Sequence, residues 1–370
     1  MKRTLIVDWL DKYGGAERVI TSLQNTFGFE TIYALVNTMK LTDIKKITSN
    51  FNVTIITTSL NIFGNFFRLF FFTFHYFITK IKVSKNVDTI ISSSHAIAKG
   101  IVKSNPKQLH ISYFQARNFK YIWDDADLYF GALRFFLQPL ISYLRKKDCQ
   151  QAQHPDFIIS NSHFVKNWVK EKYDRDSVVI YPPVDLKQFV LQTKKEDYFV
   201  AVGRIVAYKR FDLIVETFNQ TNKKLIIIGD GPELKKLKKK ARSNIHFTGY
   251  IDAQQVHHYI SKAKGFLHIG IEDFGIAPIE AQACGTPVIA YNAGGIKETV
   301  KHLETGVLFQ NQTPEALLEA IDLFETMDWN YETIHHHAQF FSTERFEKEL
   351  LSFVENCEKE TFRNVSEHSE

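Results

Sequence analysis

Short apolar runs recur along the chain and alternate with longer stretches of mixed polarity. Such runs are typical of buried strands, and the stretches between them are long enough to cross over as helices. The first half predicts strands at residues 4–8, 31–35, 53–57, 89–92, 109–113 and 157–160. The second half predicts strands at residues 198–202, 225–228, 245–247, 265–268 and 287–290. The pattern therefore predicts an α/β fold with two parallel, doubly wound sheets.

The alternation stops and restarts at Tyr181-Pro182-Pro183, where the prolines favour an extended link between domains. We expect an N-terminal domain over residues 1–183 and a C-terminal domain over residues 184–345. Residues 346–370 are expected to form a helix that packs back on the N-terminal domain. Open parallel sheets bind ligands beyond the carboxyl ends of their strands, so a cleft between the two halves is the expected site.

Cysteine usage and the first residues indicate a cytoplasmic protein. The chain has 370 residues and three cysteines, Cys149, Cys284 and Cys357, which are far apart in the sequence. This spacing argues against a disulfide framework or a zinc site and fits a reducing compartment. Asp8 and Asp11 interrupt the first apolar run. That run therefore predicts a strand and not a signal peptide.

Charge is distributed unevenly along the chain. Residues 1–185 carry 24 Lys and Arg against 15 Asp and Glu, and the remainder carries 22 against 26. A basic first half attracts phosphate groups, an anionic acceptor or an anionic membrane surface. An ordinary solvated basic face is the alternative interpretation.

One aromatic stretch stands apart from the rest of the sequence. Residues 62–78 read IFGNFFRLFFFTFHYFI. Asn65, Arg68 and His75 interrupt it, which argues against a helix that spans a bilayer. Two interpretations stay open: a helix in the membrane interface, or a core helix or lid over an acceptor site. The interfacial interpretation places the protein at the inner face of the cell membrane.

The most informative stretch is residues 270–286, GIEDFGIAPIEAQACGT. Pro278 predicts the first turn of a helix, and Gly275 allows the backbone to come close to a ligand. The free N–H groups at such a helix start favour a diphosphate. Glu272 and Glu280 flank this start, and their carboxylates can accept hydrogen bonds from the hydroxyls of a sugar and a ribose.

Two cations follow the first strand of the second half. Arg204 and Lys209 would neutralise a diphosphate and stabilise it as a leaving group. Gly14-Gly15, after the first strand of the chain, predicts a tight turn lined by backbone N–H groups. The sequence around Gly229-Asp230-Gly231 is interpreted as a structural turn beside the nucleotide.

Together these stretches resemble glycosyltransferase family 4, whose members are retaining enzymes of the GT-B fold, two Rossmann-like domains facing across a cleft. Glu272 and Glu280 match the family's paired-glutamate motif, and Arg204 and Lys209 match its diphosphate-binding Arg and Lys. Gly14-Gly15 matches its glycine loop. The resemblance covers about residues 1–345 and extends to a bacterial subset that includes O-antigen and capsule mannosyltransferases.

The resemblance implies retention of configuration with no protein nucleophile and no metal or other cofactor. The leaving phosphate would help to deprotonate the acceptor hydroxyl. Glu272 would lie beside the donor sugar and Glu280 beside the ribose. The backbone at Phe274, Gly275, Ile276 and Ala277 would hold sugar and phosphate. GDP-mannose is the favoured donor, and a UDP-sugar is the alternative.

One residue departs from the family's pattern. A histidine is usual after the fifth N-terminal strand, and Gln115 stands about there. Glutamine can hydrogen-bond a sugar hydroxyl but cannot take a proton. His95 and His110 are candidates to replace the missing histidine, and either could instead be structural. Gln115 and His95 are thus the candidates for contacts with sugar or acceptor.

The sequence predicts a hexosyltransferase that acts on a cell-surface glycan or lipid-linked acceptor. A non-catalytic scaffold protein of the same fold is the alternative, and Gln115 is its support. Two other polar clusters are interpreted as structural and not as functional sites. The three adjacent histidines 335–337 point in different directions on a helix and predict no metal site. Asp124, Asp125 and Asp127 are interpreted as a helix cap and loop. No nucleic-acid-binding module is visible.

Overall fold

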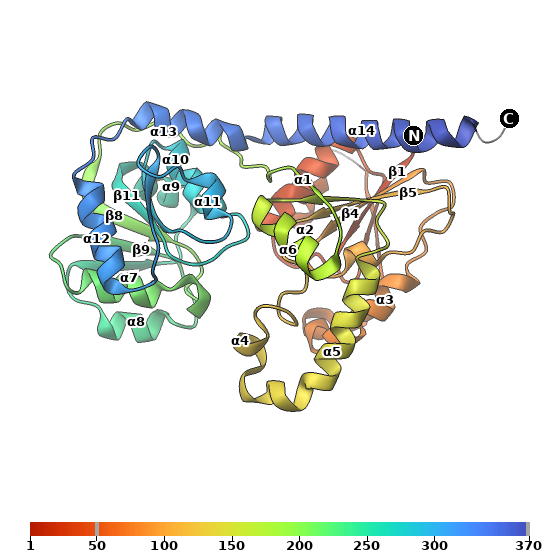
Figure 1. Ribbon diagram of the computed structural model, residues 1–370, viewed down its shortest axis with the longest axis horizontal. Coiled ribbons are helices and arrows are strands. Elements are labelled where there is room, and N and C mark those ends of the chain that lie inside the picture. Colours follow the sequence, from red (N-terminus) through yellow and green to blue (C-terminus); the bar gives the residue numbers. More distant parts are fainter. Residues whose placement is uncertain (49–51, 368–370) are drawn as a thin grey trace. The chain divides into compact units, whose positions relative to one another are not determined.

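The computed structural model describes residues 1–48 and 52–367, which form two compact units. The N-terminal unit comprises residues 1–183 and 344–370, and the C-terminal unit comprises residues 184–343. Each unit is built on its own parallel sheet with helices on both faces, so the predicted class of two doubly wound α/β domains is confirmed (Figure 1).

The sheet of the N-terminal unit has seven parallel strands in the order β3-β2-β1-β4-β5-β6-β7. Its strands are β1 (Arg3–Val7), β2 (Thr31–Ala34), β3 (Thr54–Thr57), β4 (Thr89–Ser94), β5 (Leu109–Phe114), β6 (Phe157–Ser160) and β7 (Val178–Val179). Its α-helices are α1 (Gly15–Phe27), α2 (Leu41–Thr48), α3 (Phe74–Lys80), α4 (Ala126–Phe130), α5 (Arg134–Gln151), α6 (His163–Tyr173) and α14 (Thr343–Glu367). Three 3₁₀ helices complete it: η1 (Ser59–Thr73), η2 (Ala98–Gly100) and η3 (Gly131–Leu133).

Alternation along the strands divides this core into two layers, because successive side chains point to opposite faces of a sheet. Leu5 and Val7 face a cluster completed by α1, α2 and α14. Ile6 faces the other cluster, which is completed by η1, α3 and α5. The strands are buried on both faces, as expected of a parallel sheet.

Helix α14 closes the N-terminal core from the far end of the chain. Its buried residues Phe346, Leu350 and Val354 recur at helical spacing and join the cluster around Leu5. The ring of Phe346 packs edge-on against Tyr113 of β5 at 5.6 Å.

The sheet of the C-terminal unit has six parallel strands in the order β10-β9-β8-β11-β12-β13. Its strands are β8 (Glu196–Val202), β9 (Leu225–Ile228), β10 (Ile245–Gly249), β11 (Ala263–His268), β12 (Val288–Tyr291) and β13 (Gly306–Phe309). Its helices are η4 (Ala207–Lys209), α7 (Phe211–Phe218), α8 (Leu234–Lys240), α9 (Ala253–Lys262), α10 (Ile276–Ala283), α11 (Ile296–Thr299), α12 (Pro314–Glu325), α13 (Tyr331–Ala338) and η5 (Gln339–Phe341).

Both sheets reverse their strand order at one point. In the N-terminal unit this switch point lies between β1 and β4, and in the C-terminal unit it lies between β8 and β11. At a switch point the two following loops turn to opposite faces and leave a crevice for a ligand. The loops after these four strands are therefore the places to look for function.

The aromatic stretch differs from the single regular helix that was expected. Residues 59–73 form 3₁₀ helix η1, which is kinked at Gly64 (φ 49°), and α3 follows. Gly64 adopts a left-handed conformation that a regular helix does not contain, so the stretch bends. Within the described residues, no helix combines the length and the apolar character needed to cross a bilayer.

Candidate functional site

The switch point of the C-terminal unit brings Lys209 and Glu272 together. Lys209 ends η4, after β8, and Glu272 lies in the loop after β11. The ammonium Nζ lies 2.7 Å from the Glu272 carboxylate, and both side chains are half-buried. Burial alone would lower the pKa of Lys209, but the adjacent carboxylate outweighs it and the pKa is raised. The raised pKa favours the protonated, positively charged form of Lys209 at this switch point.

Backbone contact fixes these two loops to each other. A Cβ atom at Gly270 would lie 2.9 Å from the Cα of Lys209 and 3.0 Å from the carbonyl oxygen of Tyr208. Only glycine allows this approach. The sequence GIED thus places Glu272 beside Lys209 through the glycine that precedes it.

Helix α10 begins directly after this loop. Gly275 occupies its N-cap with φ 91°, and Ile276 and Ala277 supply backbone N–H groups in the first turn. Phe274 is buried and packs against Phe341 at 5.6 Å, which anchors the loop below the helix start. Glu280 lies on the same helix and is half-buried. The start of α10 is thus an N–H-rich edge beside the Lys209–Glu272 pair.

Arg204 lies on the loop after β8, and its side chain is exposed. The turn around Gly231 supports this loop. The N–H of Ile205 donates to the carbonyl of Asp230 at 2.9 Å, and a Cβ at Gly231 would lie 2.2 Å from the Ile205 carbonyl oxygen. The structural interpretation of this turn fits these contacts, since it holds the Arg204 loop in place.

Sequence reasoning missed the role of Gly294 and Gly295 in this site. The N–H of Gly295 donates to the carbonyl of Glu272 at 2.9 Å. A Cβ at Gly294, where φ is 73°, would lie 2.4 Å from that same carbonyl oxygen. Nothing in the local sequence around these glycines indicates which loop they contact. They shape the loop that carries Glu272.

His268, the last residue of β11, was also missed. Its side chain is buried, and its Nε2 atom has no hydrogen-bond partner among the described residues. Burial lowers the pKa of this imidazole, so it is neutral at pH 7. His268 is thus a buried ring with an unpartnered nitrogen, close enough to Glu272 and Lys209 for their charges to affect its pKa.

In the N-terminal unit, Asp8 and His95 meet at the other switch point. Asp8 follows β1, and its buried carboxylate accepts four backbone N–H groups, those of residues 95–98, at 2.6–3.0 Å. It also lies 2.9 Å from Nδ1 of His95. Burial would raise the pKa of Asp8, but His95 and these N–H groups lower it overall. Burial would lower the pKa of His95, but Asp8 raises it overall.

The glycine turn lies at the same edge. Gly14 caps α1, and its N–H donates to the Glu17 carboxylate at 2.9 Å, while Gly15 begins the helix. Burial raises the pKa of Glu17, and the charge of Glu17 contributes to the raised pKa of His95. The structure therefore groups Gly14, Glu17 and His95 around the end of β1.

Gln115 and His110 differ in position. Gln115 follows β5, donates through Nε2 to Ser93, and leaves its buried Oε1 unpartnered among the described residues. His110 lies inside β5 and hydrogen-bonds Ser92 at 2.8 Å. Burial lowers the pKa of His110 to about 3, so the ring stays neutral. His110 is fully buried inside the strand, whereas His95 lies at the sheet edge beside Asp8.

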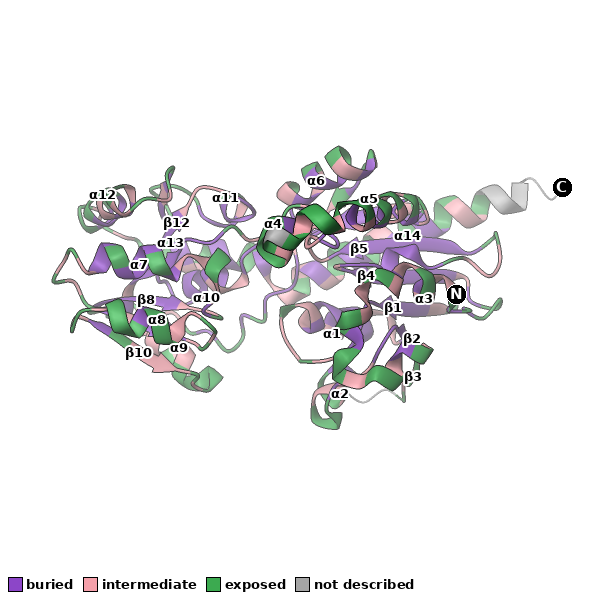
Figure 2. Ribbon diagram, turned by 90° about the horizontal axis from the view of Figure 1, so that it is seen from below, coloured by how far each residue is buried: buried purple, intermediate pink, exposed green. Residues whose placement is uncertain are grey.

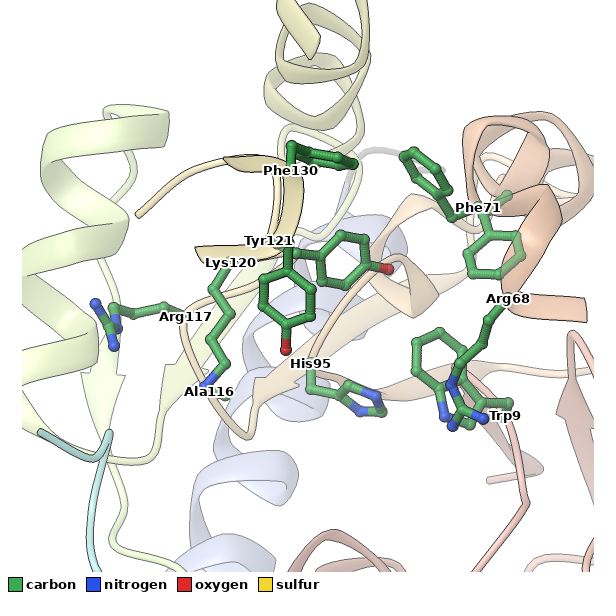
Figure 3. A pocket seen from close by; sticks show the side chains of 11 residues that line it. Trp9, Arg68, Phe71, His95, Ala116, Arg117, Lys120, Tyr121 and Phe130 are labelled. Carbon is green, nitrogen blue, oxygen red and sulfur yellow. The ribbon is translucent and has the colours of Figure 1, made fainter. Parts of the chain in front are cut away.

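A cavity of about 400 Å³ opens beside His95 in the N-terminal unit (Figure 3). Aromatic rings form most of its wall: Trp9, Phe71, Phe74, Tyr121, Tyr129 and Phe130. His95 and Trp9 lie at one end, with their rings in edge contact at 4.6 Å. Arg68 covers the Trp9 ring and pairs with Asp11 at 2.6 Å. Aromatic walls with a few polar groups suit a sugar ring or an apolar group.

The remaining polar clusters have partners of their own. Asp124 pairs with Arg117 at 3.3 Å, Asp125 with Lys120 at 3.8 Å, and Asp127 with Arg134. His337 is buried on α13 and contacts the carbonyl of Thr299 at 3.2 Å. Over residues 1–48 and 52–367, no group of three or more His, Cys, Asp or Glu side chains could hold a metal ion.

The fold is that of known GT-B glycosyltransferases. The crystal structure of the Anabaena protein HepE in complex with UDP is similar with a TM-score of 0.69. That similarity covers 96% of this chain and 100% of HepE, at 17% sequence identity. Structural similarity at this level of sequence identity establishes the fold, but it does not show which ligand this chain binds.

The C-terminal unit also matches a sequence family. Residues 185–339 match the family model of glycosyl transferases group 1. This segment is a group 1 glycosyl transferase domain, and the resemblance inferred from its motifs is confirmed there.

Two relatives agree with that assignment. A Mycobacterium tuberculosis GDP-mannose-dependent alpha-(1-6)-phosphatidylinositol monomannoside mannosyltransferase is 30% identical over 141 residues, 33% of this chain and 36% of that protein. The Escherichia coli O-antigen chain mannosyltransferase C is 25% identical over 231 residues, 57% of this chain and 59% of that protein. The chain spans about half the length of the first curated relatives it matches.

Proposed function

We propose that the protein is a retaining glycosyltransferase that moves a hexose from a nucleotide sugar to a hydroxyl of a cell-surface glycan or lipid-linked acceptor. The observation that carries this proposal is the Lys209–Glu272 pair at 2.7 Å, at a switch point and beside the start of α10. It lies inside the segment that matches the glycosyl transferase family. The C-terminal domain binds the donor, and the N-terminal domain binds the acceptor.

Each group in the donor site has a role in this proposal. Lys209, Arg204 and the N–H groups at the start of α10 bind the diphosphate. Glu272 accepts hydrogen bonds from the donor sugar, and Glu280 accepts them from the ribose. The backbone from Phe274 to Ala277 contacts sugar and phosphate. Gly14 and Gly15 are further candidates for donor contacts through their backbone N–H groups.

The reaction breaks the bond between the sugar's anomeric carbon and a phosphate oxygen, and the electron pair stays on that oxygen. Cations and N–H groups that are already in place stabilise the charge that develops there. The same oxygen takes the proton of the acceptor hydroxyl, whose oxygen forms the new glycosidic bond on the same face of the sugar. No metal, cofactor or protein nucleophile enters this scheme.

Mannose is the favoured sugar and GDP the favoured nucleotide. Both relatives named above are mannosyltransferases, and the mycobacterial one is GDP-mannose-dependent. The complex of HepE with UDP supports a UDP-sugar as the alternative donor.

The acceptor is assigned to the aromatic cavity of the N-terminal domain. The pKa of His95, on its wall, is raised by the adjacent Asp8, which favours the protonated ring as a hydrogen-bond donor. Gln115, with its unpartnered oxygen, is the second candidate for a contact with sugar or acceptor. If the acceptor is joined to a lipid, the proposed location of the protein is the cytoplasm, at the inner face of the cell membrane.

A ligand screen tests the proposal. GDP-mannose, UDP-glucose and the free nucleotides are each added to the full chain, and the melting temperature is followed. A ligand at a hundred times its dissociation constant adds about 2.7 kcal/mol of stability. The proposal predicts stabilisation by at least one nucleotide sugar, and no response to any of a broad panel would contradict it.

A non-catalytic scaffold protein remains the second candidate because Gln115 replaces the usual histidine. Slow hydrolysis of the bound donor separates the two. A transferase hydrolyses its donor, and Glu272→Ala abolishes that hydrolysis. A scaffold protein binds the nucleotide sugar but leaves it intact in the wild type.

A further inference from the structure

One helical layer of the C-terminal unit carries opposite charges on its two sides. Helices α8, α7 and α12 cover the same face of the sheet, because Leu237, Phe218 and Leu317, one from each helix, join a single core cluster. Helix α7 packs against both of the others, so α8 and α12 flank it. Figure 2 shows the three helices in one row, each with exposed residues. The outer side of this layer is therefore one continuous surface.

Helix α8 forms the basic part of this surface. Residues 235–242 read KKLKKKAR and contain six cations and no acid. All six cations are exposed. Lys236 pairs with Glu233 at 3.4 Å, but Lys235 and Lys239 form no ion pair among the described residues. We call the exposed cations of residues 235–242 the basic face.

Helix α12 forms most of the acidic part. Residues 314–334 contain six Asp and Glu residues and no Lys, Arg or His. Glu315, Glu319 and Asp322 recur at helical spacing, so they share one side of α12, and all three are exposed. None of the three forms an ion pair within the part of the chain that the structure describes. Glu216 of α7 is also exposed, and we call these four carboxylates the acidic face.

Both faces contain charges that their own helix does not favour. Lys235 and Lys239 are four residues apart on one side of α8, where like charges repel each other. Lys235 also lies in the first turn of α8, where the helix dipole disfavours a cation. Asp322 lies in the last turn of α12, where the dipole disfavours an anion. Local placement of this kind is expected where charges serve a contact outside the helix.

We propose that a second copy of the chain docks on this surface, with the basic face of each copy against the acidic face of the other. The surface carries both signs of charge, so a copy related by a two-fold axis matches both of its parts at once. A purely anionic partner, such as polyphosphate, would match α8 but would be repelled by α12. The inference does not rest on the proposed transfer reaction, because association requires neither donor nor acceptor.

The size of the surface limits the strength of this contact. Neighbouring helices lie about 10 Å apart, and α12, with its 12 residues, is about 18 Å long. Three helices therefore cover about 500 Å², which is less than the roughly 800 Å² per partner of a standard stable interface. We expect a reversible dimer that forms at high protein concentration and dissociates as salt screens the charges.

Sedimentation velocity of the full chain over a range of concentrations tests the proposal. At low salt we expect an equilibrium between monomer and dimer, and at high salt the dissociation constant should rise by about tenfold or more. A wild type that stays monomeric at low salt, or a dimer that salt does not weaken, would overturn the proposal. Retention of such a monomer on polyphosphate would show that α8 binds a polyanion instead.

Charge reversal assigns the dimer to the two faces. The α8 variant carries four changes: Lys235→Glu, Lys236→Glu, Lys238→Glu and Lys239→Glu. The α12 variant carries three changes: Glu315→Lys, Glu319→Lys and Asp322→Lys. In either variant alone the two faces carry the same sign of charge, so the dissociation constant of the dimer should rise by about tenfold or more.

An equimolar mixture of the two variants restores complementary charges, and we expect it to form the dimer. Wild-type melting temperatures show that the variants fold, and a mixture that then stays monomeric would overturn the proposed pairing. A control variant reverses four exposed lysines of the N-terminal unit: Lys40→Glu, Lys45→Glu, Lys85→Glu and Lys107→Glu. This control should associate as the wild type does, because its changes lie outside both faces.

Discussion

Lys209 and Glu272 form an ion pair of 2.7 Å although they follow different strands, β8 and β11. The pair exists because those strands are neighbours in the sheet and because Gly270 allows their loops to touch. The carboxylate therefore holds the ammonium in place at the switch point without any ligand. Such preorganised charge is the largest single contribution to many transfer reactions.

The first prediction concerns this pair. Lys209→Met removes the cation proposed to stabilise the leaving diphosphate, and the turnover number should fall by about a hundredfold to a thousandfold. Steady-state kinetics with the donor identified by the ligand screen measure it. Lys301→Met is the control, because Lys301 is exposed and pairs only locally with Glu304 at 3.1 Å. Equal activity of the two variants would remove Lys209 from the proposed mechanism.

The second prediction concerns the glycine that supports the Glu272 loop. Gly294→Ala places a Cβ 2.4 Å from the Glu272 carbonyl oxygen, so the loop must shift and donor affinity should fall by about tenfold or more. Gly249→Ala is a matched control. Gly249 has nearly the same φ, 72°, but a Cβ there would meet no atom within 4 Å.

Titration calorimetry of both alanine variants separates two effects. The backbone strain is common to both sites, whereas the clash with Glu272 occurs only at Gly294. Similar donor affinities for the two variants would argue that the contact with the Glu272 loop is irrelevant to binding.

The third prediction is a pH dependence of stability from the Asp8–His95 pair. Because the pKa of Asp8 is lower in the folded protein, its carboxylate stabilises the fold at pH values above about 4, the ordinary pKa of an aspartate. This stabilisation is lost as the pH falls through the lowered pKa. Because the pKa of His95 is higher in the folded protein, its protonated ring stabilises the fold at pH values below about 6.5, the ordinary pKa of a histidine. This stabilisation is lost as the pH rises through the raised pKa. His95→Gln should therefore destabilise the protein more at pH 6 than at pH 9.

Melting temperatures at the two pH values measure this difference. His336→Gln, an exposed change on α13, should give the same small effect at both. If His95→Gln also showed equal effects at both values, the imidazole would not be charged in the folded protein.

The fourth prediction concerns a fully buried ion pair between η2 and α5 of the N-terminal unit. Lys99 Nζ lies 2.6 Å from Asp148, which also accepts hydrogen bonds from Trp123 and Tyr173. Lys99→Met leaves that carboxylate uncompensated and should cost about 3–5 kcal/mol in the free energy of unfolding. Urea unfolding measures the loss.

An exposed pair supplies the comparison for Lys99. Lys103 lies 2.6 Å from Asp156, with both side chains partly exposed. Lys103→Met should cost no more than about 1 kcal/mol. Equal losses in the free energy of unfolding for the two variants would show that burial does not make the Lys99–Asp148 pair more important to stability.

The strands were predictable from sequence wherever an apolar run was long enough. Each predicted strand is present, and the bounds differ by a residue or two at most ends. β7 was missed because it has only two residues, and β13 because GVLF is short and lies beside glycine and threonine. The bend in residues 62–78 was missed because the sequence does not reveal that Gly64 adopts a left-handed conformation.

The candidate site was partly predictable for a different reason. Lys209 and Glu272 belong to recognisable local motifs, and the order of the strands then places them together. Asp8 was interpreted only as a charge interrupting an apolar run. Its carboxylate is in fact buried under the N–H groups of residues 95–98, which no local pattern connects to it. Gly294 likewise depends on a contact between two loops.

Helix α14 has a consequence for biosynthesis. The core around Leu5 includes Phe346, Leu350 and Val354, which leave the ribosome after the entire C-terminal unit. The C-terminal unit is continuous in sequence and can complete its core first. The N-terminal sheet precedes the C-terminal unit in the chain, yet part of one of its faces stays uncovered until α14 has been made, and the apolar surface exposed during that interval favours chaperone binding.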